Sequence, residues 1–205
     1  MKRPFVLGLT GSVGMGKSTT ADMFRDMGIP VWNADAVVHA LYEPGQPGAR
    51  AVATLCPDAI DEEGRVDRAR LRAWVRETDD ALAALDAAIH PLVQADRAAF
   101  IDRMAREGHD IVVLDIPLLF ETGAEKEADA IAVVSAPAEV QRARVLARPG
   151  MTEADFERIL ARQMPDADKR ARADYVIPTT DMDTTRKAVE DILRDIRARL
   201  RKERS

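Results

Sequence analysis

The chain has 205 residues, of which 46% are hydrophobic and 32% charged, and its formal net charge is −5. This composition suits one globular α/β domain with insertions and excludes a disordered chain. The single cysteine, Cys56, excludes an internal disulfide, and the negative charge argues against a dedicated nucleic-acid surface. No secretory signal opens the chain and no apolar run approaches the roughly 18 residues of a membrane span, so we expect a cytoplasmic protein without membrane partners.

A glycine-rich run between an expected strand and an expected helix is the first functional signal. The strand covers residues 5–9, the helix covers residues 19–27, and between them Gly11–Ser18 completes the pattern G-x-x-x-x-G-K-[ST]. Glycines let backbone N–H groups point inward, Lys17 supplies a charge for the β- and γ-phosphates, and the Ser18 hydroxyl can bind Mg²⁺. Strand, loop and helix in this order predict a nucleotide-triphosphate site.

A helical insertion is expected after the second strand. Residues 29–32 read as that strand, and a helix follows to Glu43 before the run Pro44–Gly48 breaks it. From about 49 to 108 the sequence favours helices, with Asp67 as an N-cap and with Leu82, Leu85 and Ile89 on one apolar face. Pro91 is expected to break or kink the longest of them.

Three later apolar runs predict further strands at residues 111–115, 130–134 and 175–177. Continuous Val and Ile runs separated by helices are typical of parallel strands buried on both faces. The last helix, over 183–202, carries an apolar stripe that favours core packing, with a partner-binding helix as the alternative. The fold class is therefore α/β, with a parallel sheet of about five strands.

Two acids follow predicted strands, at the sheet edge where ligands bind in open α/β folds. Asp35 comes after the second strand and can accept a proton from an attacking hydroxyl, although an N-cap role explains it equally well. Asp115 ends the strand over 111–115. Eight basic residues lie between 142 and 172. Two interpretations of them stay open, a solvated helix face and an arginine-bearing lid.

The class of nucleotide-binding protein follows from what accompanies the glycine loop. The N-K-x-D pattern of GTPases is absent, and the strand ending at Asp115 lacks the adjacent acids typical of ATP-driven machines. A base near the loop and arginines for the transferring phosphoryl group instead favour a small-molecule kinase.

At this point the chain resembles the dephospho-CoA kinase family over nearly its whole length. The resemblance rests on Leu9-Thr10-Gly11 before the glycine loop, the Asp35 segment, Pro44–Gly48, Gly64–Arg68, His90-Pro91, Pro117–Glu121, Gln141 with Arg144 and Arg148, Gln163, and Ala173–Ile177. It implies transfer of the ATP γ-phosphate to the ribose 3′-hydroxyl of dephospho-CoA, the final step of coenzyme A synthesis, with ATP and Mg²⁺ as cofactors.

The resemblance also implies roles for single residues. Asp35 matches the catalytic base, with Lys17 as its catalytic partner, and His90 belongs to the substrate site. Asp115 is expected to reach Mg²⁺ through water, with Ser18. The ATP-binding residues implied are Gly11, Gly14, Met15, Gly16, Lys17, Ser18, Thr19, Arg144 and Arg148.

The implied organisation is one kinase domain in three parts. The core covers 1–43, 109–136 and 173–205, a helical CoA-binding insertion covers about 44–108, and a lid covers about 137–172. We expect a monomer or weak homo-oligomer.

Two positions depart from the family pattern. Asn33 stands where the family usually has Asp, which removes a charge, and His39 stands where it often has Arg. Histidine does not reproduce arginine's permanently charged fork. Two alternatives stay open: a kinase for another nucleoside or nucleotide, and a nucleotide-dependent switch without transfer chemistry.

Overall fold

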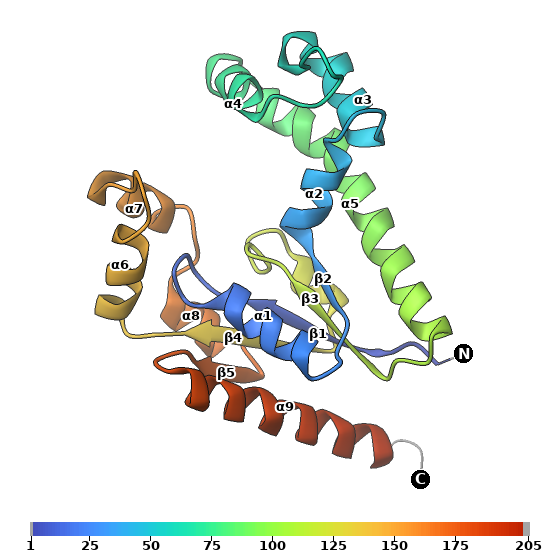
Figure 1. Cartoon of the computed structure of the whole chain (residues 1–205), viewed down its shortest axis with the longest axis vertical. Coiled ribbons are helices and arrows are strands. Elements are labelled where there is room, and N and C mark those ends of the chain that lie inside the picture. Colours follow the sequence, from blue (N-terminus) through green and yellow to red (C-terminus); the bar gives the residue numbers. More distant parts are fainter. Residues whose placement is uncertain (1, 203–205) are drawn as a thin grey trace. The chain divides into compact units, whose positions relative to one another are not determined.

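The protein is described here by a computed structural model covering residues 2–202 (Figure 1). Its contacts divide the chain into two compact units. One comprises the residues up to Trp32 and those from Met104 onward, and the other comprises Asn33–Arg103. The second unit begins earlier than the insertion expected at 44–108, because the helix before Pro44 packs with the helix after it.

The first unit is built on a five-stranded sheet in the order β2-β3-β1-β4-β5. Its strands are β1 (Phe5–Thr10), β2 (Val31–Asn33), β3 (Ile111–Asp115), β4 (Ala130–Ser135) and β5 (Tyr175–Pro178). In the central pair, β1 and β3 run parallel with Leu9 opposite Asp115. The predicted α/β class with a five-stranded parallel sheet is confirmed, and β3 is buried along its whole length, as its apolar run predicts.

The α-helices of this unit, besides the end of a longer helix that begins in the second unit, are α1 (Lys17–Asp26), α6 (Ala138–Leu146), α7 (Glu153–Leu160), α8 (Asp166–Ala171) and α9 (Met182–Lys202). Helices α1 and α9 pack against each other, and α9 also contacts β5 (Figure 1). The apolar stripe of α9, which consists of Val189, Ile192, Leu193, Ile196 and Leu200, lies in the main core cluster. Core packing is therefore the correct interpretation of that stripe.

The second unit is helical and has a core of its own. It contains α2 (Ala34–Leu41), α3 (Pro47–Leu55), α4 (Arg68–Glu77) and most of α5 (Ala81–Arg106), with a short 3₁₀ turn at Pro57–Ala59. Its core includes Tyr42, Val52, Leu71 and Ile89. The side chain of Asp67 accepts hydrogen bonds from two N–H groups at the start of α4, which confirms the predicted N-cap.

Two expectations about this unit are wrong. The break expected at Pro91 is absent, because α5 continues through this residue, and the nearby Ile89 and Leu92 pack in the core of the unit. The kink offered as the alternative stays a prediction. Leu82, in the first turn of α5, is 58% exposed and is not part of an apolar face with Leu85 and Ile89. Within residues 2–202, no helix is long and apolar enough to cross a bilayer.

Candidate active site

The loop between β1 and α1 leaves backbone donors free at a helix start. Gly14 and Gly16 have φ values of 75° and 83°, a conformation that side chains disfavour, and Gly16 precedes α1 without a side-chain cap. The first intrahelical bond runs from the Thr20 N–H to the Gly16 carbonyl, at 3.1 Å. The three residues before Thr20 therefore have no helical acceptor for their N–H groups, which is the arrangement that binds phosphate.

Two of the loop glycines are required by close packing as well. A Cβ on Gly11 would lie 2.2 Å from Val134 of β4, and a Cβ on Gly14 would lie 2.5 Å from Val145 of α6. Such distances leave no room for any side chain. The loop is therefore held against β4 on one side and α6 on the other.

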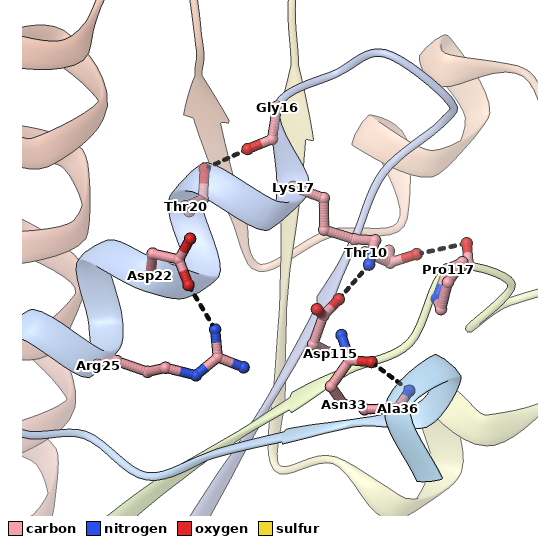
Figure 2. Close-up of polar contacts among 10 residues, drawn as sticks. All are labelled: Thr10, Gly16, Lys17, Thr20, Asp22, Arg25, Asn33, Ala36, Asp115 and Pro117. Atoms are coloured by element: carbon pink, nitrogen blue, oxygen red, sulfur yellow. Dashed lines mark hydrogen bonds and ion pairs between the residues drawn. The ribbon is translucent and has the colours of Figure 1, made fainter. Parts of the chain in front are cut away.

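The lysine of the loop meets the acid at the end of β3. The Lys17 ammonium forms an ion pair with Oδ1 of Asp115, whose side chain is 1% exposed (Figure 2). The β1–β3 register produces this contact, because Asp115 lies opposite Leu9, two residues before the glycine run. Nearby, the Thr10 hydroxyl donates to the Pro117 carbonyl at 3.1 Å, which joins β1 to the segment after β3.

Thr179, which follows β5, was not found from the sequence and proves central to the loop. Its buried hydroxyl donates to the Met15 carbonyl at 2.8 Å. Arg144 donates to the Thr179 carbonyl at 2.6 Å, so its guanidinium lies against the sheet edge. Arg148, one turn further along the chain, is exposed. The signal that could have identified Thr179 is its position directly after a strand, at the edge where β1 and β3 also end.

Glu121 anchors the segment that returns from the expected lid. Its Oε1 accepts from the Met164 N–H at 2.8 Å and pairs with the ammonium of Lys169 at 2.9 Å. The Lys169 side chain is fully buried. Burial acts to raise the pKa of Glu121, but the hydrogen bonds from Lys169 and Met164 outweigh it and hold the pKa below its usual value of 4.5. Glu121 therefore does more than cap a helix.

The remaining predicted residues lie in the helical unit. Asp35 is exposed in the first turn of α2, and the N-cap of that helix is Asn33, which accepts from the Ala36 N–H at 2.7 Å (Figure 2). The N-cap explanation of Asp35 is thereby wrong. His39 accepts a hydrogen bond from Arg68 at 2.7 Å, and His90 is exposed beside Gln94.

The oxygen ligands at the loop fit a magnesium ion that is also bound by nucleotide phosphates. Mg²⁺ in such sites takes one or two protein oxygens and otherwise keeps water and phosphate ligands. The exposed Ser18 hydroxyl directly follows Lys17, whose ammonium contacts the Asp115 carboxylate. Among residues 2–202 no cluster of three or more His, Cys, Asp or Glu side chains could hold a metal by itself.

The protein has a parallel sheet, an uncapped glycine loop after β1 and a lysine at the start of the following helix. Together these features define a P-loop nucleotide-binding protein. The match to known families is narrower. Residues 5–184 match the dephospho-CoA kinase family, and the chain belongs to that family of ATP-dependent kinases.

Individual relatives agree with the family match. The chain is 55% identical over 195 residues to the dephospho-CoA kinase of Cereibacter sphaeroides, covering 95% of this chain and 97% of the relative. The crystal structure of TT1252 from Thermus thermophilus is 34% identical with a TM-score of 0.76, covering 97% of this chain and 99% of that one. A dephospho-CoA kinase structure from Campylobacter jejuni has a TM-score of 0.65 at 20% identity, covers 93% of this chain and 96% of that one, and supports the fold.

Proposed function

We propose that this kinase transfers the γ-phosphate of Mg-ATP to the ribose 3′-hydroxyl of dephospho-CoA, giving CoA and ADP. The observation that carries the proposal is the uncapped start of α1 with Lys17 held on Asp115, in a chain that matches the family from residue 5 to 184. Phosphoryl transfer depends chiefly on positioning and charge neutralisation, which this loop is built to supply.

The loop residues bind and orient the nucleotide. We assign phosphate contacts to the backbone N–H groups of Gly14 and of residues 16–19, and to the Lys17 ammonium. Gly11 and Met15 shape the loop, through close packing on β4 and through the carbonyl that Thr179 holds. Ser18 and Asp115 would hold Mg²⁺, which supplies charge neutralisation at the β- and γ-phosphates when it is bound.

We assign to Asp35 the role of the base that accepts the proton of the attacking hydroxyl. Its exposed carboxylate in the first turn of α2 is free to accept the hydrogen of the 3′-hydroxyl as the O–P bond forms. His90 belongs to the same helical unit, and we assign it to the substrate side. We assign Arg148 to the ATP phosphates because it is exposed, whereas Arg144 must first leave Thr179 to reach them.

The test measures ADP release from Mg-ATP with and without dephospho-CoA, using AMP and adenosine as competing acceptors. Stimulation by dephospho-CoA alone, with CoA as product, supports the proposal. Stimulation by AMP would instead place the chain among nucleotide kinases. No stimulation by any acceptor would favour a nucleotide-dependent switch.

A further inference from the structure

Two glutamine side chains hold one residue of the phosphate loop, Val13, from opposite ends of the segment expected to be the lid. Gln141 of α6 donates from Nε2 to the Val13 carbonyl at 2.8 Å. Gln163, between α7 and α8, accepts at Oε1 from the Val13 N–H at 3.0 Å. Gln141 is only 6% exposed, so its amide has little access to competing water.

The chemistry of the two contacts is opposite, and the backbone dictates it. A carbonyl oxygen only accepts, so position 141 must present a donor. A backbone N–H only donates, so position 163 must present an acceptor. A glutamine amide carries both a donor and an acceptor without a charge, so the same side chain meets either demand.

Gln141 and Gln163 together form a clamp on Val13, and this clamp sets the orientation of two peptide planes in the loop. The Ser12–Val13 peptide is held at its N–H by Gln163 and at its carbonyl by the Met15 N–H, at 3.1 Å. The Val13–Gly14 peptide is held at its carbonyl by Gln141. A trans peptide directs its N–H away from its carbonyl, so Gln141 also determines the direction of the Gly14 N–H. That N–H belongs to the donors assigned above to phosphate.

We propose that Gln141 and Gln163 are positioning residues that pre-orient the phosphate loop for ATP and tie its shape to the segment between them. This inference rests on the proposed ATP site and extends it to residues outside the loop. Since neither side chain is assigned to the acceptor, the clamp affects ATP binding far more than dephospho-CoA binding.

The experiment exploits the opposite chemistry of the two contacts. Gln141→Met and Gln163→Met remove one contact each, and each is expected to raise the KM for ATP about tenfold. Glutamate accepts but does not donate when ionised. Gln163→Glu should therefore retain more ATP affinity than Gln163→Met, whereas Gln141→Glu should retain less than Gln141→Met.

Ala154→Glu, at an exposed position in α7, controls for an added negative charge and should leave the KM for ATP unchanged. The KM for dephospho-CoA and kcat at saturating ATP should stay within about twofold in the methionine variants. In the double variant Gln141→Met/Gln163→Met, the KM for ATP should rise by less than the product of the two single-variant increases, because both residues hold Val13.

The clamp would be refuted if the Glu variant bound ATP more tightly than the Met variant at both positions, or less tightly at both. A wild-type KM for ATP in both methionine variants would also refute it. Failure of the proposed function is distinguishable, because it is seen in the wild-type enzyme as turnover that does not respond to dephospho-CoA. In that case calorimetric titration with ATP alone still tests the clamp.

Discussion

The Lys17 ammonium and the Asp115 carboxylate form an ion pair that joins the phosphate loop to the end of β3. The two side chains are 14% and 1% exposed. Each charge therefore compensates part of the hydration that the other loses on burial. Nucleotide phosphates offer Lys17 a second source of negative charge.

Asp115→Asn tests this exchange of partners. We expect its free energy of unfolding to fall, by less than the about 3–5 kcal/mol of a fully buried pair because Lys17 keeps some exposure. ATP without metal should then raise the melting temperature of the variant more than that of the wild type, since its phosphates supply the missing charge. Equal shifts would contradict the exchange. Asp22→Asn, which breaks an exposed pair with Arg25, is the control and should change little.

Asp35→Asn tests the assigned base. Asparagine keeps the size of the side chain but accepts no proton, so kcat should fall by about 10² to 10⁴. The Kd for Mg-ATP should stay unchanged, because Asp35 lies in the helical unit and not in the phosphate loop. Asp58→Asn, at another exposed position of that unit, is the matched control. Full turnover in Asp35→Asn would refute the assignment.

Gly14→Ala tests whether close packing, beyond backbone strain, makes this glycine necessary. Gly14 and Gly28 share φ values of 75° and 76°, so alanine costs each a similar strain of about 1–2 kcal/mol. A Cβ at Gly14 meets Val145 at 2.5 Å, whereas at Gly28 nothing lies within 4 Å. We therefore expect Gly14→Ala to lose ATP affinity and at least about 1 kcal/mol more stability than Gly28→Ala. Calorimetry and denaturant unfolding measure the two effects, and equal losses would contradict the packing argument.

Glu121→Gln tests the buried anchor and its pH dependence. The variant leaves the Lys169 ammonium buried without a counter-charge, which should cost about 3 kcal/mol at neutral pH. Because the pKa of Glu121 is lower in the folded protein, its stabilising effect is complete above its ordinary pKa of 4.5 and is lost as the pH falls through the folded-state value. The difference in the free energy of unfolding between the wild type and Glu121→Gln should therefore become smaller below about pH 4.5.

A pH-independent gap would mean that the ion pair is not its source. Lys169→Met is the companion variant. It removes the buried charge, and the remaining Glu121 carboxylate is 19% exposed and can stay hydrated. It should cost less than Glu121→Gln, and the double variant should recover part of the loss.

Much of the fold was readable from local patterns. The strands, the glycine loop, the Asp67 cap and the stripe of α9 each follow from residues adjacent or periodic in the chain. The family resemblance was also legible, because Pro117–Glu121 and the glycine loop are contiguous runs. The break expected at Pro91 and the place on an apolar face expected for Leu82 were wrong, because a local pattern does not show which positions of a helix meet the core.

The contacts that shape the phosphate loop were not readable, because they join residues far apart in the chain. Gln141 and Gln163 contact Val13, and Thr179 contacts Met15. A glutamine or threonine in a helix or loop has no local signature of its partner, since a hydrogen bond depends on where two chain segments meet. The eight adjacent residues 11–18 thus determine the phosphate-binding chemistry of the loop. The order of strands in the sheet determines which distant side chains hold the loop in place.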